Sequence, residues 1–223
     1  MPTSQGRNWI TRKVSDIPLG RYGDQLASPL HGKYFEHVQR GNLFYISTAV
    51  AGSAIPIDTT GGPTMMLWNP AGSGVDAVLG RYTASQASGT TAGGQIGLMS
   101  VSSGELDAAT ATGALINAFT QAAFGTAVFN GRLNNGNKPK IKSQIAAAAT
   151  NAITAGTWIR SLGMFYGAIV TTSAVHTGSK FIYDFDGEVI LPPGTAVYTA
   201  SSIDSVALFQ QTWSWYEVPT NPQ

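Results

Sequence analysis

The sequence predicts an all-β protein, a jelly-roll-like β-sandwich with an extended N-terminal arm. From residue 42 onward, short segments rich in β-branched and aromatic residues recur at nearly regular spacing, with turn residues between them. The 26 glycines and 11 prolines among 223 residues suit a protein of many turns better than a helical bundle. Strand-like and helix-like segments do not alternate, which argues against a doubly wound α/β fold.

Residues 1–41 are predicted to form the arm, and residues 42–223 the sandwich. In the arm, apolar residues are scattered and follow neither the helical nor the strand period. Pro18, Pro29 and several glycines interrupt any regular element there. Basic residues outnumber acidic ones in the arm, whereas the rest of the chain is mildly acidic. Such a segment cannot build its own core, so we expect it to be ordered on another surface.

The first half of the sandwich contains four predicted strands. Each is a run of β-branched, aromatic or aliphatic residues bounded by glycine, proline or asparagine. The four strands are expected at residues 42–50, 64–68, 75–82 and 95–101.

The middle of the sequence is ambiguous. Residues 105–124 are rich in alanine, which favours a helix, but Gly113 and several threonines oppose a long one. Helix and loop therefore stay open for this segment. Residues 140–145 alternate like a strand, and Asn130-Gly131 and Asn135-Gly136 predict tight turns.

The last third of the chain predicts strands with short connections. They are expected at residues 158–162, 164–171, 181–185, 188–191, 196–200 and 206–216. Asp186-Gly187 predicts a tight turn between two of them, and Pro219 stops the last.

Composition excludes several classes of protein. Cysteine is absent, which removes disulfides, thiolate nucleophiles, zinc fingers and iron–sulfur clusters. The N-terminus lacks the apolar core of a secretory signal, and no apolar stretch approaches about 20 residues. Charged residues make up only 11% and the formal net charge is +1, so nothing in the sequence requires nucleic acid or a membrane. We expect a protein that is made in the cytoplasm and carries no cofactor.

One acidic cluster, Asp184, Asp186 and Glu188, allows three interpretations. Asp and Gly are preferred in hairpin turns, which is the favoured one. A calcium loop would need a bidentate glutamate six residues after Gly187, where the sequence has Pro193. Paired carboxylates for glycoside hydrolysis would need one strand to run through the turn. The three histidines, His31, His37 and His176, have no metal-ligand spacing, and we expect no metal site.

Two other groups of residues have binding alternatives. Lys138, Lys140 and Lys142, with Arg132 nearby, are either a solvated strand edge, which is favoured, or a phosphate contact. Trp213 and Trp215 share one face of the last strand. They fill the core or a subunit interface, or else they stack on a sugar. No nucleophile, phosphate-loop or zinc-protease motif is present, so we do not expect an enzyme.

Three segments carry a resemblance to a known family. They are the residues GNLFY at 41–45, LWNPAGSG at 67–74, and EVILPPGTA at 188–196 together with TWSWYEVP at 212–219. A strand that ends in N-P-x-G-S-G, followed late by L-P-P-G-T-A and a closing W-x-E region, resembles virion proteins of tailed bacteriophages. The chain is also similar in pattern to trimeric jelly rolls of the tumour-necrosis-factor and C1q shape.

The resemblance implies a structural virion protein on the capsid surface, a decoration or cement protein that stabilises the shell without catalysis. Its expected partners are the major capsid protein and two further copies of itself, in a homotrimer. Low charge and a Ser/Thr/Ala/Gly-rich surface suit large interfaces. The alternatives are a tail, neck or baseplate component, a carbohydrate-binding module, or a hydrolase that uses the acidic cluster. The residues expected to contact the partner lie in the arm: Arg7, Trp9, Ile10, Arg12, Lys13 and Tyr22.

Overall fold

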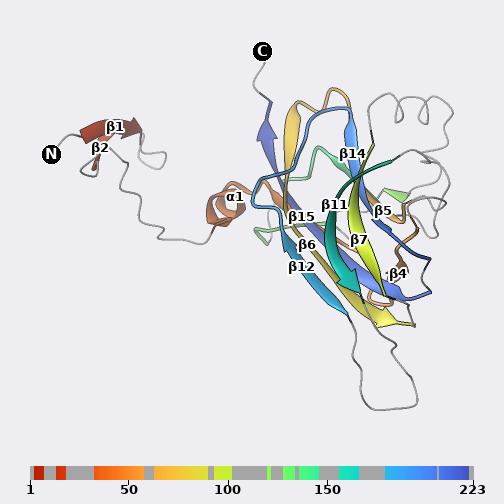
Figure 1. Cartoon of the computed structure of the whole chain (residues 1–223). Coiled ribbons are helices and arrows are strands. Elements are labelled where there is room, and N and C mark those ends of the chain that lie inside the picture. Colours follow the sequence, from red (N-terminus) through yellow and green to blue (C-terminus); the bar gives the residue numbers. More distant parts are fainter. Residues whose placement is uncertain are drawn as a thin grey trace. The chain divides into compact units, whose positions relative to one another are not determined.

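A computed structural model describes the chain in eleven stretches, and the account below concerns these alone. They are residues 3–7, 14–18, 33–57, 63–89, 93–101, 120–121, 128–133, 136–145, 156–165, 179–204 and 206–220. The chain divides into two compact units, Met1–Phe35 and Glu36–Gln223. Each unit is described by itself (Figure 1).

The first unit contains an antiparallel pair of strands, β1 (Thr3–Arg7) and β2 (Val14–Pro18). The expectation that the arm holds no regular element was therefore wrong. Backbone N–H and C=O groups can hydrogen-bond between two strands whatever their side chains are. A two-stranded pair therefore needs no sustained alternation of apolar residues. The division also falls at Phe35 rather than at residue 41.

The second unit contains one short helix and thirteen strands among its described residues. The helix is α1 (Phe35–Arg40), whose first residue belongs to the first unit. The strands are β3 (Leu43–Ser47), β4 (Ser53–Ala54), β5 (Met65–Asn69), β6 (Val75–Ser88), β7 (Gly94–Val101), β8 (Thr120–Gln121), β9 (Val128–Asn130), β10 (Lys142–Ile145), β11 (Thr157–Phe165), β12 (Lys180–Asp184), β13 (Ile190–Leu191), β14 (Thr195–Ser201) and β15 (Leu208–Pro219).

These strands form two antiparallel sheets, as the sequence predicts (Figure 1). One sheet has the order β11-β7-β14-β5-β10-β8, and the other has the order β12-β6-β15-β3-β9, with β4 and β13 at its margins. The pairing is nested: β7 pairs with β11, β6 with β12, β5 with β14, and β3 with β15. The first and last long strands of the second unit are therefore neighbours.

The main core fills the space between the two sheets. Strand β15 shows the cause, because its apolar residues alternate: Phe209, Trp213 and Trp215 point inward and are buried. Tyr82 on β6 packs against Trp213, with ring centroids 5.0 Å apart. Aromatic pairs of this kind add to the stabilisation that burial of their area supplies.

A buried amide joins the two sheets inside this core. Gln211 on β15 accepts a hydrogen bond from the hydroxyl of Tyr82 at 3.0 Å and another from that of Thr199, on β14, at 2.7 Å. Its backbone N–H donates to the hydroxyl of Thr48 at 2.9 Å. Complete burial raises the pKa of Tyr82, so the phenol keeps the proton that it donates. The network fixes how the sheets face each other.

A second, smaller cluster lies on the outer face of the six-stranded sheet. Met66, Met99 and Tyr198 form a row across three neighbouring strands and are almost fully buried. The indole of Trp158, on β11, packs against this cluster and crosses Gly97. A Cβ atom at residue 97 would overlap that ring, which explains the glycine in the middle of a strand.

The structure confirms most of the predicted strands. The two strands expected at 158–162 and 164–171 are one strand, β11, in the described residues, because Gly163 continues the ladder across an irregular register. Helix α1 was not predicted: its six residues are too few to show a helical period. Of the segment 105–124, the described residues are Thr120 and Gln121, which form β8; the rest lies outside the described stretches.

Candidate functional site

The arm residues predicted to contact a partner lie almost entirely outside the described stretches. Arg7 is the last residue of β1, in the first unit. Trp9, Ile10, Arg12, Lys13 and Tyr22 are not among the described residues. Their predicted contacts stay a prediction.

The acidic cluster forms a tight turn, as the favoured interpretation predicts, but not a hairpin, because β12 and β13 both pair with β6 and not with each other. Asp186 and Gly187 both have positive φ, 51° and 84°, and the N–H of Glu188 donates to the carbonyl of Phe185 at 2.8 Å. Asp184 pairs with Arg81, and Glu188 pairs with a different arginine, Arg160. Among the described residues, no group of three or more His, Asp or Glu side chains is placed to hold a metal ion.

Trp213 and Trp215 do share one face of β15, but that face is the inner one. Both side chains have 0% relative exposure and belong to the core between the sheets. The interpretation as a sugar-stacking platform was therefore wrong, because a platform must reach solvent. The alternation of the strand gives the shared face, but it does not say which of the two faces is covered.

His37, on α1, has a packing role. Its ring stacks on Tyr216 of β15 with centroids 3.8 Å apart, and burial lowers its pKa. The other two histidines, His31 and His176, lie outside the described residues. The stacking places α1 over one end of the outer face of the seven-stranded sheet.

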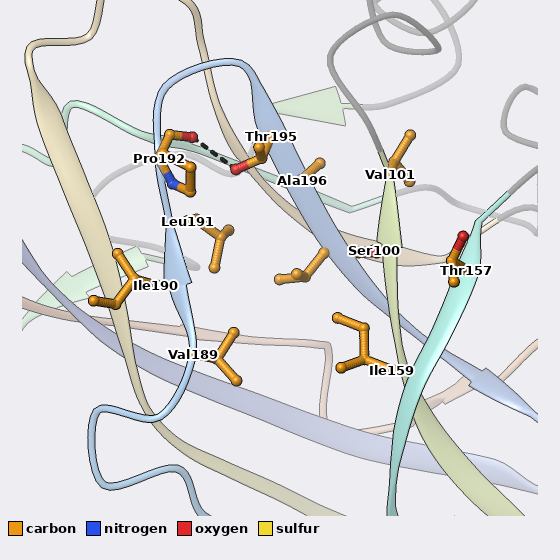
Figure 2. Close-up of a pocket in the computed structure, with 11 residues that line it drawn as sticks. Ser100, Val101, Thr157, Ile159, Val189, Ile190, Leu191, Pro192, Thr195 and Ala196 are labelled. Carbon is orange, nitrogen blue, oxygen red and sulfur yellow. Dashed lines mark hydrogen bonds between the residues drawn. The ribbon is translucent and has the colours of Figure 1, made fainter.

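An apolar groove opens between the facing edges of the two sheets. Figure 2 shows Val189 and Leu191 reaching into it from the β13 side, and Ile159 reaching in from β11. The groove has a volume of about 330 Å³, and none of the described residues that line it carries a charge. At its upper end the hydroxyl of Thr195 donates to the carbonyl of Pro192 at 2.7 Å. The groove has room for an apolar side chain, and its described lining offers no acid–base group.

A polar bridge joins the same two edges beside the groove. Arg160, on β11, donates to the hydroxyl of Tyr183, on β12, at 2.7 Å and forms a close ion pair with Glu188. Glu188 raises the pKa of Arg160 through this hydrogen bond. The bridge holds the two sheet edges together.

The outer face of the seven-stranded sheet carries several exposed apolar side chains. One row of cross-strand neighbours runs Phe129, Tyr45, Ser214, Arg81 and Asp184 over five strands, β9 to β12. Residues directly opposite in register share a face, so this row points away from the core.

Two neighbouring rows complete this outer face. The next row consists of hydroxyl side chains followed by an edge isoleucine: Ser47, Thr212, Thr83 and Ile182. On the other side, Val78 lies between Tyr216 and Ile190. Four large side chains of the face are exposed, namely Tyr45 at 37%, Phe129 at 44%, Ile182 at 58% and Ile190 at 54%.

This face combines exposed apolar groups with uncharged polar ones and one ion pair. The guanidinium of Arg81 reaches the carboxylate of Asp184 at 2.7 Å. The hydroxyls of Ser47 and Thr212 lie 2.7 Å apart. Partial burial raises the pKa of Tyr45, and its neutral phenol can donate a hydrogen bond. The face is chemically suited to binding a protein or another uncharged surface.

The sequence alone indicates part of this face. Tyr45 alternates with the inward-facing Phe44 and Ile46, so its opposite orientation follows from the strand period. Its neighbour Phe129 comes from a strand of three residues that the sequence did not predict. Its place beside Tyr45 depends on a long-range register.

Comparison of the chain with known protein families, with curated proteins and with solved structures found no match. No helix of the described residues is long and apolar enough to cross a membrane.

Proposed function

We propose that this chain is a structural protein of a tailed-phage virion, which decorates or cements the capsid by binding the major capsid protein. The observation that carries the proposal is the outer face of the seven-stranded sheet, where Tyr45, Phe129, Ile182 and Ile190 are exposed among serines and threonines. Stable interfaces are enriched in aromatic residues and depleted of charge at their centres. Exposed apolar groups gathered on one face mark interaction sites.

The nested pairing of the strands supports the jelly-roll form of the sandwich. The resemblance to trimeric jelly rolls adds the proposal of a homotrimer. Light scattering after size exclusion would then give three times the chain mass of 23.3 kDa. A monomer at every concentration tested would contradict the preformed trimer.

The proposed mechanism requires no chemistry. A protein that binds the assembled shell more tightly than free capsid subunits stabilises the shell by mass action. The ordered body supplies a rigid face, and the arm unit supplies a second contact. Two weak contacts on one chain act together because binding of one raises the local concentration of the other.

The test is co-sedimentation with capsids that lack this protein. We expect the double variant Tyr45→Thr/Phe129→Thr to bind at least about ten-fold more weakly, because buried aromatic anchors carry most of the energy of an interface. Threonine keeps the β-propensity of both positions. Val206→Thr is the matched control, since Val206 is exposed and precedes β15.

Each result is decisive. If the double variant binds as tightly as the unaltered chain, the outer face is not part of the interface with the capsid. Absence of binding by the unaltered chain would contradict the proposal that the protein binds the capsid. Binding to tails in place of capsids would favour the alternative of a tail, neck or baseplate component.

A carbohydrate-binding module is the second candidate, on one specific observation. Tyr45 and Phe129 are exposed neighbours on the outer face, in the same cross-strand row as Arg81 and Asp184. Sugars are recognised by such combinations of aromatic and hydrogen-bonding groups. Glycan-array binding that Tyr45→Thr abolishes, together with absence of capsid binding, would support it.

A further inference from the structure

A cleft with cationic walls lies on the second unit. It has a volume of about 480 Å³ and opens between the end of α1, the start of β3, residues 137–140 and the end of β15. Three of the side chains that line it, Arg40, Lys138 and Lys140, carry positive charge.

Neither lysine forms a close ion pair with an acid among the described residues, although Glu217 acts on Lys140 electrostatically. Arg40 is engaged with Glu36 one helical turn earlier, at 3.4 Å, and that pair is exposed. The ion pairs found in the described stretches involve neither Lys138 nor Lys140. Both ammonium groups lie on exposed residues, so a ligand can reach them.

The acid in the cleft wall, Glu217, is buried and hydrogen-bonded to the backbone. Its carboxylate accepts hydrogen bonds from the backbone N–H of Lys140, at 2.8 and 3.0 Å, and from that of Ile141 at 3.0 Å. The residue has only 7% relative exposure. Glu217 therefore fixes the segment that presents the lysines, while both of its oxygens are already used.

A second set of hydrogen bonds holds the other end of the same segment. The side-chain amide of Asn130 donates to the carbonyl of Gly41 at 2.7 Å and to that of Asn137 at 3.4 Å. The backbone that carries Lys138 is thus anchored on both sides, to the α1–β3 connection and to β15. A site that is ordered before binding loses less entropy when the ligand arrives.

We propose that this cleft binds the carboxylates of an extended acidic segment of a partner protein. Charge complementarity selects an acidic ligand, since the exposed walls are cationic and the carboxylate within is buried. Val75 and Pro219 supply apolar wall beside the charges, which suits a polypeptide. Nucleic acid is disfavoured because three cations in one concavity do not make the basic stripe that follows a phosphate backbone.

The experiment uses the full chain and a fluorescent, N-acetylated tetraglutamate amide, with binding followed by anisotropy at low ionic strength. We expect Lys138→Gln/Lys140→Gln to weaken binding about ten-fold, as two exposed ion pairs allow. Lys142→Gln/Lys180→Gln removes two charges of the second unit that do not line the cleft, and it is expected to leave binding unchanged. Salt should weaken the complex of the unaltered chain.

Three results would overturn the proposal. They are absence of tetraglutamate binding at low salt, equal weakening by the two double variants, and preferential binding of inorganic phosphate or a ten-nucleotide single-stranded DNA. Thermal melting of each variant separates loss of binding from loss of fold. The experiment contains no capsid, so its outcome is independent of the proposed virion function.

Discussion

Glu217 shows how one buried side chain links stability to pH. Burial penalises the charged carboxylate and raises its pKa, although hydrogen bonds from two backbone N–H groups, those of Lys140 and Ile141, act in the opposite direction. In the unfolded chain the pKa returns to its ordinary value. The folded protein therefore binds the proton more tightly than the unfolded one does, and this contribution to stability is lost as pH rises through the folded-state pKa.

We expect Glu217→Gln to remove that contribution. The difference in free energy of unfolding between the unaltered chain and the variant should fall as pH rises from about 4 to about 8. Urea denaturation across this range measures it. Asp204→Asn, at an exposed position, serves as the control. This variant should show the same dependence of the free energy of unfolding on pH as the unaltered chain. A difference that is constant with pH would contradict the burial account.

At the scale of the element, the turn at residues 185–188 connects β12 and β13, which follow one another along the same neighbouring strand, β6. Both β12 and β13 pair with β6, and the turn between them requires positive φ at Asp186 and Gly187. An aspartate tolerates this region better than most residues, whereas a glycine adopts it without strain.

Replacement of Gly187 by alanine should lower the free energy of unfolding by about 1 to 2 kcal/mol. The cause is the backbone alone, since the nearest atom to an added Cβ is the Tyr216 hydroxyl oxygen at 3.7 Å. Chemical denaturation measures the change. Gly136→Ala is the matched control, because that glycine has open space around it and no positive φ, and it should be neutral. Equal effects at both positions would contradict the turn argument.

Most strands of the sandwich can be predicted because each depends on local pattern. The run Leu208 to Pro219 alternates, so a strand with two faces follows from the sequence, although the predicted bounds, residues 206–216, differ from those of β15 at both ends. Short strands cannot be predicted in this way: β9 exists because it pairs with β3, and α1 because it packs on Tyr216. Their stability comes from tertiary contacts, which have no local signature.

The candidate site is harder to predict than the fold, because it depends on which face of a sheet stays open. The same alternation that identifies Trp213 and Trp215 as neighbours cannot tell a buried pair from an exposed one. The cationic cleft likewise brings together Arg40, Lys138 and Glu217, which are far apart in the chain. The lysine cluster is visible in the sequence, but the cavity beside it is not.

At the scale of the whole molecule, the division into two units predicts where the chain can be shortened. Residues 36–41 belong to the body: His37 stacks on Tyr216, and the carbonyl of Gln39 accepts a hydrogen bond from Arg132 at 3.0 Å. Deletion of residues 1–35 removes none of these contacts, whereas deletion of residues 1–41 removes all of them.

We therefore expect the chain without residues 1–35 to keep the melting temperature of the body, and the chain without residues 1–41 to melt several degrees lower. A loss of about 1 kcal/mol lowers the melting temperature of a domain of this size by about 2 to 4 °C. Circular dichroism during heating distinguishes the two. Identical melting of both shortened chains would show that α1 does not stabilise the sandwich.

The nested pairing of the strands also sets the order in which the chain can fold during synthesis. Strand β15 lies between β6 and β3, so both of those strands have an open edge until residues 208–219 have left the ribosome. The early pair β7 and β11 can form sooner, because it closes the shortest loop among the nested pairs. Exposed edges on a nascent chain invite pairing with neighbouring nascent chains. The sandwich thus depends on its last long strand to close the sheet, and interruption of translation just before that strand would release an aggregation-prone fragment.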